Sequence, residues 1–140
     1  MYQIILDTNV IVSSFRSNKG ASYRLTNLIP DHRFEINLST TLVLEYEEVL
    51  KRQATDLGVD DRQIDDVIDY LCKNSNRRRV HYLWRPSLSD PDDDFLLELA
   101  VECESDYIVT YNSRDFLAAD RFQIRTVTPR EFLKVIGEIE

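Results

Sequence analysis

The sequence predicts an α/β protein, a three-layer α/β/α sandwich with a central parallel sheet and helices on both faces. Short apolar runs typical of buried strands alternate along the chain with longer segments whose apolar residues recur at helical spacing. This alternation is typical of parallel sheets whose strands are connected by helices. The chain has 140 residues with only 3 Gly and 4 Pro, so we expect residues 1–140 to form one domain without a linker.

The first half of the chain contains two predicted strands. Residues 2–6 form a mainly apolar run, as expected of a buried central strand, and the polar residues 7–9 follow as a strand end or helix cap. Residues 34–38 alternate apolar and polar side chains, which predicts the second strand. Residues 39–41 carry hydroxyls that can cap a helix, and apolar residues follow at helical spacing to about Arg52.

The middle of the chain is expected to hold two helices around an acidic loop. Residues 60–71 have one apolar helical face and begin with an acidic cap. A short strand is predicted at 80–84, before a Pro-bounded acidic loop. The acidic residues 90–94 then precede a helix that starts with residues 95–100, where negative charge suits the positive end of the helix dipole.

The last part of the chain is expected to add two strands and a helix. Residues 107–110 are a buried strand, and residues 124–127 are the last strand. Thr128 and Pro129 have the types favoured at the N-cap and the first position of a helix. They predict a closing helix over residues 130–136.

The composition limits the class of protein. Lys and Arg number 17 against 25 Asp and Glu, a net charge of -8, which argues against a passive nucleic-acid coat but not against an enzyme with acids at a metal site. No apolar run approaches the roughly 18 residues of a membrane span, and the start lacks a secretory signal pattern. The 2 cysteines, Cys72 and Cys103, are far apart. We therefore expect a cytoplasmic protein without a membrane segment.

Acidic residues fall at the predicted carboxyl edge of the sheet, where open α/β sheets place their sites. Asp7 follows the first strand, Glu45 lies in the first turns of the helix after the second, residues 92–94 precede the strand 107–110, and Asp115 lies in the loop after it. Carboxylates gathered in one crevice repel each other unless a cation neutralises them. Hard oxygen ligands favour Mg²⁺ or Mn²⁺, so the pattern predicts a metal site for a phosphate-containing substrate.

Five segments of the chain carry a resemblance to a known family. They are Ile5-Leu6-Asp7-Thr8-Asn9-Val10, residues 42–50 around Glu45, Asp90-Pro91-Asp92-Asp93-Asp94 with Leu96, Leu97 and Ala100, residues 109–116 around Asp115, and the ending 127–133. In this order they resemble the PIN-domain family of metal-dependent ribonucleases over essentially the whole chain. The resemblance implies a PIN-like fold.

The resemblance also implies the site residues. The catalytic and metal-binding acids are Asp7, Glu45, Asp93 and Asp115, with Asp94 as the alternative to Asp93. The implied supporting groups are Asn9, Thr110 and Asn112, where many relatives carry Asp in place of Asn112. One or two Mg²⁺ or Mn²⁺ ions would support phosphodiester hydrolysis, which requires no Ser, Cys or His nucleophile.

The implied activity is hydrolysis of single-stranded RNA. In particular, the chain is similar to stand-alone prokaryotic, VapC-like members that act as toxins of toxin–antitoxin pairs, which implies RNA, a cognate antitoxin and a second copy of the chain as partners. The basic run Arg77, Arg78 and Arg79 is a candidate RNA contact, with a solvated edge as the alternative. A structure-specific DNA nuclease and a non-catalytic PIN-fold partner-binding module are the alternative functions.

Overall fold

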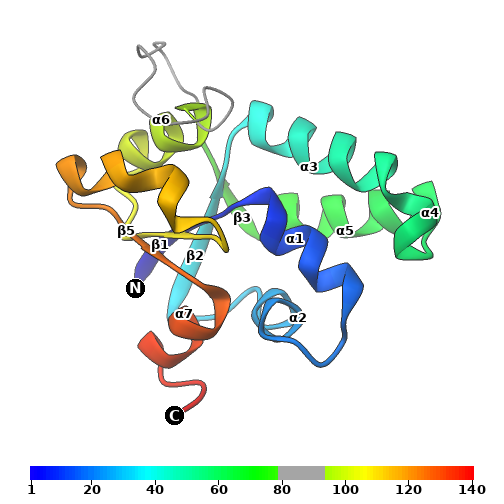
Figure 1. The fold of residues 1–140 in the computed structure, drawn as a ribbon, viewed down its shortest axis with the longest axis horizontal. Coiled ribbons are helices and arrows are strands. Elements are labelled where there is room, and N and C mark those ends of the chain that lie inside the picture. Colours follow the sequence, from blue (N-terminus) through cyan, green and yellow to red (C-terminus); the bar gives the residue numbers. More distant parts are fainter. Residues whose placement is uncertain (79–93) are drawn as a thin grey trace.

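A parallel sheet forms the centre of the protein, as a computed structural model shows for residues 1–78 and 94–140 (Figure 1). The strands are β1 (Tyr2–Leu6), β2 (Phe34–Leu38), β3 (Ser75–Arg77), β4 (Tyr107–Val109) and β5 (Arg125–Val127). Their order in the sheet is β3-β2-β1-β4-β5, and every neighbouring pair is parallel. The predicted central parallel sheet is confirmed.

The middle strand β1 explains why the first apolar run predicts a strand so clearly. Ile4 pairs with Ile36 of β2 on one side and with Tyr107 of β4 on the other. Ile4 and Ile5 are completely buried, because a central strand under two helical layers is covered on both faces. Hydrophobic burial of this kind supplies most of the stabilisation of the sheet.

Helices form the two outer layers. They are α1 (Thr8–Arg16), α2 (Ala21–Asn27), α3 (Thr40–Arg52), α4 (Ala54–Leu57), α5 (Asp61–Lys73), α6 (Asp94–Glu102) and α7 (Pro129–Val135), with a 3-10 segment η2 (Ser113–Phe122). α1 contacts α2 and α3, and α3 contacts α5; α6 contacts η2 and β1, and it also touches α3. Figure 1 shows the sheet between these two groups, the predicted three-layer arrangement. No helix in the described ranges is long and apolar enough to cross a membrane.

Capping side chains fix several helix starts that the sequence predicts. Ser39 accepts a hydrogen bond from the backbone amide of Leu42. Asp60 and Gln63 form a reciprocal capping box at α5, and Thr128 and Glu131 form another at α7. Each cap satisfies backbone donors that lack a partner in the first helical turn.

Several elements differ from the sequence predictions, and among them are the helices α1 and α4, for which the sequence analysis gives no helix. The residues of β3 are polar and half-buried or exposed, because an edge strand needs no apolar residues on both faces, and the sequence therefore gives no signal for it. The short helix α2 has only two buried residues and was also missed. Residues 113–122 form the 3-10 segment η2 where a loop was expected. The predicted strand at 80–84 lies outside the described residues.

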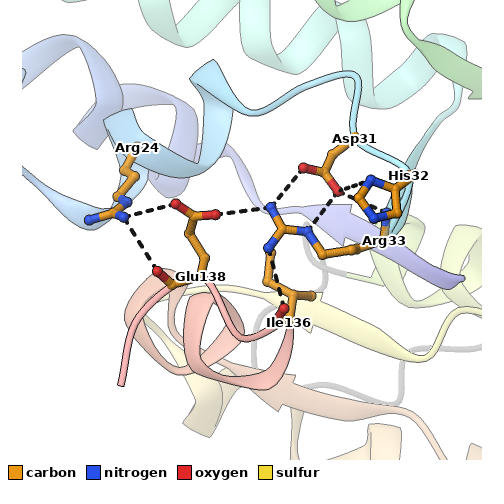
Figure 2. A network of polar contacts seen from close by, with 6 residues as sticks. All are labelled: Arg24, Asp31, His32, Arg33, Ile136 and Glu138. Carbon is orange, nitrogen blue, oxygen red and sulfur yellow. Dashed lines mark hydrogen bonds and ion pairs between the residues drawn. The ribbon is translucent and has the colours of Figure 1, made fainter.

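The C-terminal end of the chain is joined to the rest by a polar network (Figure 2). Glu138 pairs with Arg24 of α2 at 2.8 Å and with Arg33, just before β2, at 3.0 Å. Arg33 also pairs with Asp31 at 2.8 Å. The hydrogen bonds from the Arg33 side chain lower the pKa of Asp31 from 3.8 to about 2. The network lies away from the carboxyl ends of the strands, and we assign it a structural role.

Candidate active site

A cavity of about 420 Å³ opens between α1, α3 and the segment that follows β4. Its walls include three of the predicted acids, Asp7, Glu45 and Asp115, together with the predicted supporting residues Asn9 and Asn112. The acids come from positions far apart in the sequence. The parallel sheet brings them together because Asp7 directly follows β1, and the segment with Asp115 follows its neighbour β4.

Asp7 is the most buried of these acids, with 7% of its surface exposed. It caps α1, and its Oδ1 accepts a 2.8 Å hydrogen bond from the backbone amide of Thr8. Its Oδ2 accepts hydrogen bonds from the Thr110 hydroxyl at 2.8 Å and the Asn9 side-chain amide at 3.2 Å. Two of the three residues predicted to support the site, Asn9 and Thr110, therefore hold the first predicted acid in a fixed orientation.

The segment after β4 is tied to α1 by the same supporting residues. The Thr110 hydroxyl accepts a 3.0 Å hydrogen bond from the backbone amide of Asn112. The side-chain oxygen of Asn9 accepts one of 3.3 Å from the backbone amide of Tyr111. The backbone amide of Asp115 then donates to the carbonyl of Asn112 at 3.0 Å. These contacts place Asn112 and Asp115 at the rim of the cavity.

Glu45 reaches the cavity from α3. The hydroxyl of Thr8 donates a hydrogen bond to its Oε2, so Thr8 connects this acid to the start of α1. The next residue, Tyr46, is buried and donates its hydroxyl to the carbonyl of Leu6, which anchors α3 to the end of β1. Sequence reasoning did not identify Thr8 or Tyr46, although a tyrosine on a buried helical face signals a hydroxyl that needs a partner.

The charge state of Asp7 follows from its surroundings. Burial raises its pKa above 3.8, hydrogen bonds from Thr110 and Thr8 counteract this, and the carboxylate of Asp115 raises the pKa further. The influence of Asp115 on Asp7 is the repulsion expected between acids that share a crevice. A cation at this position would favour the ionised form of Asp7.

The donor chemistry of the cavity fits a hard divalent cation. Asp7, Glu45 and Asp115 present only carboxylate oxygens, the ligands that Mg²⁺ and Mn²⁺ prefer. Within residues 1–78 and 94–140, no group of three or more His, Cys, Asp or Glu residues is arranged to hold a metal ion. Mg²⁺ typically binds through one or two carboxylates, several waters and substrate phosphates, so a partial set of protein ligands is sufficient.

Some predicted residues are not described at the cavity, and two others lie elsewhere in the fold. Asp93 and Arg79 lie outside the described residues, and Asp94 begins α6 without a described side chain. Arg77 ends the edge strand β3, and the Nε of Arg78 donates a 3.0 Å hydrogen bond to Asn37. Neither of these two arginines lines the cavity, because β3 is separated from β1 by β2.

Sequence reasoning also missed a cation that lines the cavity. Arg16, at the end of α1, faces it together with Asn9, Val12 and Ser13. Val12 and Ser13 are each three or four positions from Asn9 and from Arg16, so these four residues lie on one face of a helix. Recognising this stretch as a helix would have placed Arg16 on the same face as Asn9.

Comparison with known proteins identifies the family to which this chain belongs. A comparison with curated proteins found no match. The family model described as the PIN domain matches residues 3–114, which include Asp7, Glu45 and Thr110 and end one position before Asp115. The match covers more than half of the chain, in agreement with the resemblance of its motifs and with its parallel sheet. The chain belongs to the PIN domain family.

Proposed function

We propose that this protein is a Mg²⁺- or Mn²⁺-dependent endoribonuclease that hydrolyses phosphodiester bonds of single-stranded RNA. PIN domains are generally nucleases, and the family commonly uses divalent metals. The observation that carries the proposal is the position of Asp7, Glu45 and Asp115 on one cavity beyond the carboxyl ends of β1 and β4. The proposed enzyme is a single domain, 1–140.

Each acid has a distinct part in the proposed site. Asp7 is the central ligand, because hydrogen bonds to both of its oxygens orient the carboxylate before any ion binds. Glu45 is oriented by the Thr8 hydroxyl, and Asp115 contributes from the segment that follows β4. Asp93 is proposed as the fourth acid, with Asp94 as the alternative.

A bound divalent ion would activate water and stabilise the charge that develops on the phosphate. The chain supplies the oxygen ligands for that ion, and the hydrogen bonds that Asn9 and Thr110 donate to Asp7 keep its carboxylate in place. Asn112, which is exposed at the rim of the cavity, is a neutral group in position to hold water or substrate. This division of roles requires no covalent intermediate with the protein.

The proposed biological setting rests on the resemblance to stand-alone prokaryotic members. We propose a cytoplasmic, VapC-like toxin that forms a homodimer and is inhibited by a cognate antitoxin. Co-expression with the product of a neighbouring small reading frame tests this part, since an antitoxin should co-purify with the protein and suppress cleavage. Size-exclusion chromatography of the isolated protein tests the dimer.

The nuclease proposal is tested with labelled single-stranded RNA in Mg²⁺, Mn²⁺ or EDTA. We expect cleavage with either metal and none in EDTA, and Asp7→Asn should abolish cleavage. Asp69→Asn is the matched control, because Asp69 is exposed on α5 and does not line the cavity. Cleavage that persists in EDTA would reject the metal mechanism. Cleavage of duplex DNA alone would favour a DNA nuclease, and binding without cleavage would favour a non-catalytic module.

A further inference from the structure

Arg16 is the one cation among the described residues that line the candidate active site. It ends α1, a helix of 9 residues that begins directly after Asp7. At 1.5 Å per residue, Arg16 is about 13 Å along the helix axis from Asp7. The cavity therefore has carboxylates at one end and a guanidinium at the other.

Gln53 holds this guanidinium across the groove between α1 and α3. The Nη2 of Arg16 donates a 2.9 Å hydrogen bond to the Oε1 of Gln53, and both residues line the cavity. Because Gln53 is neutral, the contact orients the guanidinium without cancelling its charge. Arginine has five N–H donors, so further donors remain for a ligand. None of the ion pairs between described residues involves Arg16.

The wall between the two ends suits a sugar–phosphate backbone better than bases. It includes Val12, Ser13 and Val49, and none of the lining residues that the structure describes is aromatic. Proteins that grip single strands by their bases stack them on aromatic side chains. A guanidinium, by contrast, recognises phosphate through charge and paired N–H donors.

We infer that Arg16 binds a second backbone phosphate of the RNA strand whose scissile phosphate lies at the carboxylates. A stacked strand advances about 3.4 Å per phosphate and an extended strand more, so the second phosphate is at most about four nucleotides away. Arg16 is then a positioning residue that makes an oligonucleotide a better substrate than an isolated phosphodiester. The inference rests on the proposed function and adds to it a substrate length and a phosphate contact.

The test compares two substrates of different length, a short single-stranded RNA and bis(p-nitrophenyl) phosphate, with Mg²⁺ or Mn²⁺. For Arg16→Ala we expect KM for the RNA to rise about tenfold with little change in kcat, the loss that one charge-assisted contact predicts. The KM for the small diester should change much less. Arg16→Lys keeps the charge and should recover part of the lost RNA affinity.

A binding measurement separates this inference from the nuclease proposal. In the Asp115→Asn background, adding Arg16→Ala should make the dependence of log affinity on log salt shallower by about 0.7, the value for one single-strand phosphate contact. Arg125→Ala is the matched control, since it removes an exposed arginine at the amino end of β5, the opposite edge of the sheet.

Two results have distinct meanings. If Arg16→Ala and Arg125→Ala have the same KM for RNA and the same salt dependence, the inference is wrong even when the protein is a nuclease. If the wild type cleaves neither substrate, the nuclease proposal fails, and the salt dependence of RNA binding still decides whether Arg16 contacts a phosphate.

Discussion

The hydroxyl of Thr110 donates a 2.8 Å hydrogen bond to Oδ2 of Asp7, although 103 positions separate the two residues in the sequence. The contact follows from the register of the two parallel strands. Leu6 pairs with Val109, so the residues that directly follow them, Asp7 and Thr110, lie side by side. Thr110 is completely buried and Asp7 nearly so. A charge-assisted hydrogen bond in such surroundings is stronger than one in water, so this pair fixes the geometry of the cavity.

Thr110→Val should test that contact, since it removes the hydroxyl and keeps the side-chain shape. Asp7 then loses a buried donor, and we expect the free energy of unfolding to fall by about 1–3 kcal/mol, measured by urea denaturation. RNA cleavage should fall as well, because the carboxylate is less well oriented. Thr110→Ser keeps the hydroxyl and should retain most of the activity; equal loss in both variants would contradict the role of the hydrogen bond.

Asp115→Asn should separate catalysis from stability. The carboxylate of Asp115 raises the pKa of Asp7, so its neutral replacement relieves repulsion. We expect cleavage to be lost while metal-free stability is equal or higher. Mg²⁺ should raise the melting temperature of the wild type by mass action, and that of the variant less. Asp120→Asn, an exposed position of the same η2 segment outside the cavity, should behave as the wild type in both measurements.

Asn112→Asp should strengthen the metal site. Asn112 lines the cavity together with Asp7, Glu45 and Asp115. An added carboxylate increases repulsion in the absence of metal and attraction for the ion in its presence. We therefore expect a lower metal-free melting temperature and a larger increase with Mg²⁺. Ser113→Asp adds the same charge at the next residue, which does not line the cavity, and an equal Mg²⁺ effect there would argue against a local site.

The Asp31–Arg33 pair predicts an acid-sensitive contribution to stability. Hydrogen bonds from Arg33 lower the pKa of Asp31 to about 2, below its ordinary 3.8. A carboxyl whose pKa is lowered in the folded state stabilises that state above the ordinary pKa, and this contribution is lost as pH falls through the folded value. The free energy of unfolding should therefore fall between about pH 4 and 2 more steeply for the wild type than for Asp31→Asn. Asp66→Asn, at an exposed position of α5, should keep the wild-type slope.

From the sequence alone, four of the five described strands can be predicted, and so can the acids Asp7 and Glu45. Residues 2–6 are mainly apolar, and Ile4, Ile5 and Leu6 are buried because β1 is covered on both faces, which makes the strand recognisable. The polar stop at Asp7 then marked its carboxyl end. Glu45 was recognisable because the capping residue Ser39 and the buried positions Leu42, Tyr46 and Leu50 define one helix and its register.

Which polar groups meet across those elements depends on how the elements pack in three dimensions. The contacts of Thr8 with Glu45 and of Arg16 with Gln53 join α1 to α3, and both depend on how the two helices pack. The strand β3 was equally hidden, since hydrogen bonds to β2 hold its polar residues at the sheet edge. The pattern of apolar residues along an element shows which of its faces is buried. Which distant polar side chains pair depends instead on the distances and angles at which the elements pack against each other. For that reason the sequence predicted the acids of the cavity, and the fold supplied the groups that orient them.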